Sequence, residues 1–177
     1  MYWSNRASVK SRVRFSGVMT VVLLSLLLPV SKSDASGIDL HWQWDNQCAE
    51  CHGHSSDFAR KFLKATDGQL QGIHHGHDLR GFMRNHYISS NEVDAIYKML
   101  LAQAGTKPRF NQECSACHDR ASAFVRQSVV LQDGVLLGRE SAQPIEKYLQ
   151  RHRRLQPDDV EFFMRLLNRV AHEVYRP

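Results

Sequence analysis

The sequence predicts an all-α protein made of two tandem copies of one small helical module. The chain matches itself at an offset of 66 residues, with eleven identities and no gap between positions 48 and 86 of the first copy. Apolar residues recur at helical spacing in each copy. No strong strand signal stands out beside these helical patterns.

The first 35 residues are typical of a secretory signal peptide. Four basic residues precede an apolar run at 18–30, and Ser33 and Ala35 supply the small residues before a cleavage point. This run is shorter than the about 20 residues that a transmembrane helix needs. We therefore expect general secretion and no membrane span after cleavage of residues 1–35. The alternative is an uncleaved N-terminal anchor.

The charge balance gives no reason to expect a nucleic acid partner. The whole chain has 23 Lys and Arg against 18 Asp and Glu. Residues 1–35 hold five of the basic residues and one of the acidic ones, so the remainder has 18 against 17. No basic stripe with interleaved aromatic residues stands out. We expect no nucleic acid binding.

The two modules are placed at residues 36–106 and 107–177, with the boundary in a segment that contains Gly and Pro. Each module is expected to run helix, short loop, helix, helix. The first helix carries a cysteine motif and continues through Phe58 to Leu63, and the pattern DGxLxG then makes a turn.

Two further helices are expected in each module. The middle helix has an apolar stripe at positions i, i+3, i+4 and i+7 that ends on a histidine, and the last helix is amphipathic. The middle stripes are Leu79, Phe82, Met83, His86 and Ile145, Tyr148, Leu149, His152. The last stripes are Val93, Ile96, Tyr97, Leu100 and Val160, Phe163, Met164, Leu167.

All four cysteines lie in two short motifs, CAECH at 48–52 and CSACH at 114–118. A zinc site made of two CxxC pairs needs about 15–20 residues between the pairs, far fewer than separate Cys51 from Cys114. A thioredoxin-like dithiol belongs to an α/β pattern, which the sequence lacks. A disulfide within CxxC closes only a very small loop, so it stabilises little.

Covalent haem attachment accounts for every fixed residue of the motif. Residues i and i+3 share a face of a helix, so the two thiols can form thioethers with the two vinyl groups of one porphyrin. The following histidine then binds the iron from one side. The sequence thus predicts two covalently bound haem c groups. The assigned residues are Cys48, Cys51, Cys114 and Cys117 as thioether donors, and His52 and His118 as proximal ligands.

His86 and His152 are the predicted distal iron ligands. They are the only other histidines shared by both modules, and each lies 34 residues after its proximal histidine. The alternative is a core histidine that is satisfied by a backbone hydrogen bond. Met83 is a rival ligand for one haem, since no methionine is matched in both modules.

Other histidines and two arginines have open roles. The cluster HHGH (His74, His75 and His77) occurs only in the first module, as an alternative ligand, a weak copper or zinc site, or a solvated loop. The matched Arg60 and Arg126 can pair with haem propionates or take ordinary helix-surface roles. Three histidines are expected at the surface: His41, His54 and His172.

The chain resembles the small dihaem c-type cytochromes. The resemblance rests on CAECH and CSACH, with a weaker likeness to class I cytochrome modules in the closing segments HYISSNEVDAIYKML and HRRLQPDDVEFFMRLL. It covers most of residues 44–170. In that family the distal ligand comes from the segment just before a final amphipathic helix. Class I modules usually supply Met there, whereas this chain supplies His.

Two functions are expected from this pattern. Six-coordinate bis-histidine iron has no open position for substrate, which predicts an electron carrier in a bacterial periplasm and not an enzyme. Its partners would be periplasmic redox proteins or a membrane quinol-linked donor, and it would act alone or as an electron-transfer subunit of an oxidoreductase. The alternative is a dihaem enzyme or gas-binding haem protein, peroxidase-like, with one open or displaceable ligand.

Overall fold

The computed structural model describes residues 37–73, 78–89 and 91–176. The predicted signal peptide and the predicted cluster of His74, His75 and His77 lie outside the described residues. In the part that is described, no helix combines the length and the apolar character needed to cross a membrane.

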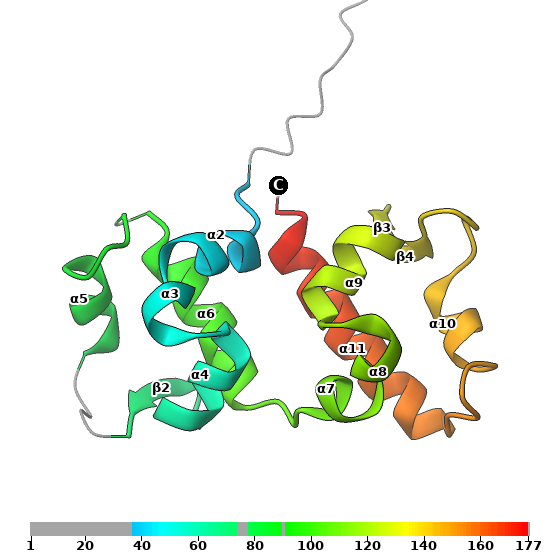
Figure 1. The fold of residues 1–177 in the computed structure, drawn as a ribbon, viewed down its shortest axis with the longest axis horizontal. Coiled ribbons are helices and arrows are strands. Elements are labelled where there is room, and N and C mark those ends of the chain that lie inside the picture. The colour runs from blue at the N-terminus through cyan, green and yellow to red at the C-terminus, as the bar shows by residue number, and fades with distance from the viewer. Residues whose placement is uncertain (1–36, 74–77, 90, 177) are drawn as a thin grey trace, which may run out of the picture. The chain divides into compact units, whose positions relative to one another are not determined.

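The first module packs its helices and one β-hairpin around one apolar cluster (Figure 1). Three of the side chains buried there are Trp44, Ile96 and Met99. The hairpin is tied to the last helix of the module, because the Tyr97 hydroxyl accepts the backbone N–H of Leu70 at 2.8 Å. The elements are α2 (Leu40–Gln47), α3 (Ala49–His52), α4 (Ser55–Phe62), β1 (Leu63–Thr66), β2 (Gln69–Gly72), α5 (Leu79–Arg84) and α6 (Val93–Ala104).

The second module repeats this order around an apolar cluster of its own (Figure 1). Phe163 and Leu167 of its last helix are almost fully buried, as the helical stripe predicts. The N–H of Gln156 donates to the Asp159 carboxylate at 3.0 Å, which caps the start of that helix. The elements are α7 (Arg109–Glu113), α8 (Ser115–His118), α9 (Ala121–Ser128), β3 (Val129–Gln132), β4 (Val135–Gly138), α10 (Ile145–Leu149) and α11 (Pro157–Val174).

The prediction of an all-α fold is wrong, because each module contains an antiparallel hairpin. β1 pairs with β2, and β3 pairs with β4. The two loop residues of each hairpin are Asp and Gly, and all four have positive φ. Asp-Gly is a strong sequence signal for a two-residue hairpin turn. The turn was expected at these positions, but the strands on either side were missed because each has only four residues.

The expected long first helix is broken into separate pieces. A positive φ of 65° at Gly53 separates α3 from α4, and a positive φ of 30° at Asp119 separates α8 from α9. Each cysteine motif therefore occupies a single helical turn. Because of this break, the orientation of the histidine that ends the turn does not depend on the axis of the helix that follows.

The expected middle helices are also shorter than predicted. α5 ends at Arg84 and α10 ends at Leu149, so His86 and His152 follow the helices instead of lying on them. Turn hydrogen bonds of 3.1 Å hold both: His86 N–H donates to the Met83 carbonyl, and His152 N–H to the Leu149 carbonyl. Each histidine thus sits on a short turn before the last helix of its module.

The described residues of both modules belong to one compact unit, and a buried pair links α2 to α11. His41 is 7% exposed, and its Nε2 lies 2.8 Å from Oε2 of Glu173, which is equally buried. The expectation that His41 lies at the surface is therefore wrong. His54 and His172 are exposed, as expected.

The hairpin turns generate a stability prediction. Gly68 and Gly134 have φ of 72° and 78°, and a Cβ at either position would meet nothing within 4 Å. Replacing either glycine with Ala should therefore lower the free energy of unfolding only through backbone strain, by about 1–2 kcal/mol. Urea unfolding followed by circular dichroism measures this change.

Gly105→Ala is the matched control. Gly105 has a negative φ of −84° and only ordinary contacts around its Cβ position. This change should leave the free energy of unfolding the same or raise it by up to about 1 kcal/mol. Equal losses at all three glycines would contradict the assigned turn geometry.

Candidate functional site

A cleft in the first module holds two facing histidines. The ring centroids of His52 and His86 lie 5.9 Å apart, with an angle of 61° between the ring planes. The cleft has a volume of about 540 Å³, within the about 300–1,000 Å³ of typical cofactor pockets. Its other lining residues are mostly apolar and include Leu63, Leu70 and Met83. The first predicted ligand pair is therefore brought together.

A cleft in the second module repeats this arrangement. The ring centroids of His118 and His152 lie 6.0 Å apart at 56°, and the cleft has a volume of about 780 Å³. All four histidines are half-buried. The second predicted pair is therefore brought together with the same separation, although its walls are more polar.

In each module, a phenylalanine ring contacts the histidine of the cysteine motif. Phe58 contacts His52 edge-on at 4.7 Å between centroids, and Phe124 contacts His118 in the same way at 4.8 Å. Such edge-to-face contacts restrict the rotation of the imidazole ring. Each proximal histidine is thus braced by the first turns of the helix that follows it.

The predicted distal ligands, His86 and His152, are held by stacking. Phe82 stacks on His86 at 4.8 Å, and Tyr148 stacks on His152 at 4.9 Å. Phe82 is 59% exposed and Tyr148 is 55% exposed, so neither is the core residue that the apolar stripe predicts. This role was not predicted, although both aromatic residues lie four positions before a matched histidine.

The separation within each pair fits one metal ion. An imidazole nitrogen binds such an ion at about 2.0–2.1 Å, so two imidazole rings on opposite sides of one ion have centroids roughly 6 Å apart. The observed 5.9 and 6.0 Å agree with this value. The described residues contain no group of three or more His, Cys, Asp and Glu side chains that could hold a metal ion. Each histidine pair therefore offers two of the ligands that a metal ion needs.

The cysteines have matching environments in the two modules. Cys48 and Cys114 are half-buried against the apolar clusters, and Cys51 and Cys117 are exposed. All four are unpaired. Cys48 and Cys51 border the first cleft, whereas no cysteine is among the residues that line the second. The cysteine turn is thus adjacent to the histidine pair most directly in the first module.

Burial governs the titration of several of these groups. Burial lowers the pKa of His52, and the nearby His86 lowers it further. Burial and the nearby His118 likewise lower the pKa of His152. Both effects favour the neutral imidazole, which is the form that binds a metal.

The first cysteine of each motif has a raised thiol pKa. Burial raises the pKa of the Cys48 thiol. Burial, aided by Glu113, also raises the pKa of the Cys114 thiol. Redox-active cysteines need a lowered pKa, so these two are not activated for disulfide exchange.

A hydrogen bond from a tryptophan side chain stabilises the break after α3. The indole N–H of Trp44 in α2 donates to the carbonyl oxygen of Gly53 at 2.8 Å. The ring of Trp44 also lies 6.2 Å from His52 and 5.3 Å from Phe58. Phe110 stands at the equivalent position of the second module, where an indole hydrogen bond is replaced by apolar packing alone.

Several other candidate residues fall outside this pattern. Met83 lines the first cleft beside His86, so it keeps the position of a rival ligand. Arg60 pairs with Asp57, and Arg126 pairs with Asp39. Neither arginine lines a cleft, which favours ordinary surface roles over contact with a cofactor.

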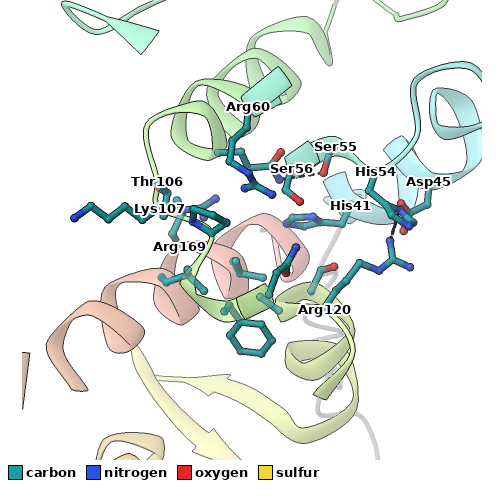
Figure 2. Close-up of a pocket in the computed structure, with 18 residues that line it drawn as sticks. His41, Asp45, His54, Ser55, Ser56, Arg60, Thr106, Lys107, Arg120 and Arg169 are labelled. Carbon is teal, nitrogen blue, oxygen red and sulfur yellow. Dashed lines mark hydrogen bonds and ion pairs between the residues drawn. The ribbon is translucent and has the colours of Figure 1, made fainter. Parts of the chain in front are cut away.

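A smaller hollow of about 70 Å³ lies where the two modules meet (Figure 2). Basic side chains surround it, but carboxylates neutralise much of their charge. Arg120 lies 3.5 Å from Asp45, and Arg169 lies 2.7 Å from Glu173. The hollow therefore lacks the concentrated charge of an anion site.

This hollow marks the seam between the two modules. Arg120 donates to Nδ1 of His54 at 2.7 Å (Figure 2), and these positions are 66 residues apart, the offset of the repeat. The other ion pairs across the seam, such as Arg126 with Asp39, join positions that are not equivalent. None of the residues that line this hollow lines either histidine cleft.

Comparisons with known proteins identify no relative: no protein-family model, no curated protein and no solved structure matches this chain.

The Trp44 hydrogen bond generates a prediction. Trp44→Phe keeps an apolar ring but leaves the Gly53 carbonyl without its indole donor, so the free energy of unfolding should fall by about 1–2 kcal/mol. Trp42→Phe in the same helix is the control, because Trp42 is 56% exposed, and it should change stability by less than about 0.5 kcal/mol. Urea unfolding of both variants measures the difference, and equal effects would contradict a specific role for Trp44.

Proposed function

We propose that this protein is a dihaem c-type cytochrome that carries electrons in the periplasm. The observation that supports it most is the repeated histidine pair: each CxxCH motif places its histidine about 6 Å, centroid to centroid, from a second histidine at a matched position. A single such pair could arise from packing. Two pairs with the same spacing, the same cysteine turn and the same aromatic contacts favour one shared cofactor chemistry.

The chain's own residues would divide the work as follows. In each module the cysteine turn would hold the porphyrin by two thioethers, and the histidine that ends the turn would bind the iron from one side. The second histidine would bind from the other side. Apolar side chains of the cleft would exclude water. The exposed Phe82 and Tyr148 would be partly covered by the cofactor, which would account for large apolar surfaces at the two clefts.

Electron transfer follows from the two axial imidazoles. When bound, a haem supplies a one-electron couple between ferric and ferrous iron. Two histidines leave no open position for a substrate, and they favour a lower reduction potential than a histidine and methionine pair. Partners would be periplasmic redox proteins or a membrane quinol-linked donor. Contacts with them would be small and transient.

The distal ligands provide the first test. His86→Ala and His152→Ala should each turn one haem from low-spin to high-spin and allow the reduced protein to bind carbon monoxide. Absorption spectra of the oxidised, reduced and carbon monoxide-treated protein measure both changes. His172→Ala is the control, because His172 is exposed on α11 and its ring forms a hydrogen bond with a carbonyl of its own helix.

The outcomes separate the two functions. Low-spin spectra of the unmodified protein without a carbon monoxide response support the electron carrier. A high-spin component in the unmodified protein would instead support the peroxidase-like alternative, with an open or displaceable ligand. Unchanged spectra in both variants would contradict the ligand assignment.

The cysteines provide a second test. Replacing both Cys48 and Cys51 with Ser should remove one covalent haem and leave the other, because each CxxCH motif attaches its own group. Mass spectrometry of the denatured protein counts the haems that stay bound to the polypeptide. Replacing Cys114 and Cys117 should give the same loss. Two retained haems in either variant would contradict covalent attachment through these residues.

A further inference from the structure

The two clefts differ in the charge of their rims. Arg139, Lys147 and Arg151 line the second cleft, with Glu140 as the only carboxylate among its described lining residues. Among the described residues, the one charged side chain that lines the first cleft is acidic, Glu50, and the adjoining pocket beside His52 and Phe82 is lined by a second carboxylate, Asp78. The rim of the second cleft thus has a net charge of about +2, and the first cleft and its adjoining pocket together have about −2, counting formal side-chain charges.

The internal repeat shows that these charges belong to one module only. At an offset of 66, the three basic residues of the second cleft correspond to Ile73, Gly81 and Asn85 of the first module. The acidic Glu50 and Asp78 correspond to Ala116 and Pro144. The shared fold and the shared histidine pair therefore do not require the basic rim. It is a feature that the second cleft has in addition.

The basic rim is exposed, and no ion pair with a described carboxylate of the protein compensates it. The side chains of Arg139, Lys147 and Arg151 are exposed. Among the described residues, no carboxylate oxygen lies within 4.0 Å of their charged nitrogens. Exposed charges of one sign around a concave site raise the local concentration of ligands of the other sign.

One of these charges is held in place by the backbone. The Arg139 guanidinium donates to the carbonyl oxygens of Arg126, Gln127 and Val129, and to the Tyr175 hydroxyl at 2.8 Å. These partners are neutral, so they fix the position of the cation without cancelling its charge. The second cleft therefore has one fixed cation and two more flexible ones.

We propose that the second cleft is the docking face for an acidic redox protein, which exchanges electrons with the module of His118 and His152. This inference rests on the proposed function and adds a partner class to one of its two sites. The ferrous iron of that module would lose one electron to an oxidised partner, or its ferric iron would gain one from a reduced partner. The part of the Tyr148 ring that the cofactor leaves uncovered, between Lys147 and Arg151 in the chain, would lie within the contact area.

The acidic rim of the first cleft excludes the same partner there. A negatively charged surface would be repelled by Glu50 and Asp78. The two clefts would therefore bind partners of different charge. Like-charge contacts of this kind reject wrong partners, while the basic rim accelerates the encounter with the right one.

The experiment measures how fast the reduced protein is oxidised by small complexes of opposite charge. Ferricyanide is an anionic one-electron oxidant, and hexaammineruthenium(III) is a cationic one; each accepts one electron from one ferrous iron. Stopped-flow traces are recorded for the unmodified protein and for the double variant Lys147→Glu and Arg151→Glu. Arg139 is left unchanged because its hydrogen bonds also support the hairpin.

A second pair of charge reversals provides the matched control. Lys64→Glu and Lys98→Glu change the net charge of the protein by the same amount, and both side chains are exposed outside either cleft. Haem content and circular dichroism are measured for every variant, so that a folding defect is recognised. Poly-L-glutamate is then added as a mimic of an acidic protein surface.

The expected results depend on the sign of the probe. Oxidation by ferricyanide should slow by about tenfold in the Lys147 and Arg151 variant, and oxidation by hexaammineruthenium(III) should become faster, because the local potential changes sign. The control variant should change either rate by about twofold or less, as screened distant charges do. Poly-L-glutamate should slow the ferricyanide reaction of the unmodified protein but not that of the Lys147 and Arg151 variant.

Two different results would overturn the inference, and they can be told apart. Equal rate changes in the two variants, with both haems present, would remove the docking face and leave the electron carrier standing. A purified protein without covalently bound haem would overturn the proposed function and the docking face together.

Discussion

Each module is organised around two imidazole rings that face each other across a cleft. The paired rings lie 5.9 and 6.0 Å apart, centroid to centroid. The elements around them determine how each ring is placed. The helix break fixes the direction of the first ring, and the short turn before the last helix fixes the second. Neighbouring aromatic rings restrict the rotation of both.

The two modules reach this arrangement with different residues. The break after the cysteine turn uses Gly53 in one module and Asp119 in the other, and both have a positive φ. Trp44 donates a hydrogen bond across the first break, where the equivalent Phe110 can only pack. The residues around the histidines thus differ between the modules, whereas the distance between the paired rings stays the same. This favours a cofactor of fixed size over incidental packing of two side chains.

Sequence patterns could predict the last helix and the paired histidines of each module. The last helices were predictable because their apolar stripes are long, and the histidines because the repeat singles out His86 and His152. The helix break was not predictable from periodicity, since the apolar spacing after the cysteine turn continues in helical register. The hairpins were signalled by their Asp-Gly loops, but strands of four residues are too short to show a clear alternation. The buried partner of His41 comes from the other module and could not be found from local sequence.

The contacts between the two modules leave both histidine clefts accessible, as a protein that passes electrons between partners would require. No described residue lines both the hollow between the modules and one of the clefts. The contacts at the hollow therefore do not occupy either cleft. His54 and Arg120 are in contact at the seam, and the buried pair of His41 and Glu173 further links the modules there. Breaking such a buried pair by removing one partner typically costs about 3–5 kcal/mol. The modules are thus joined through one set of surfaces while both clefts keep their own rims. For the proposed carrier, this arrangement lets the two rims differ in charge without any change to the contacts that hold the chain together.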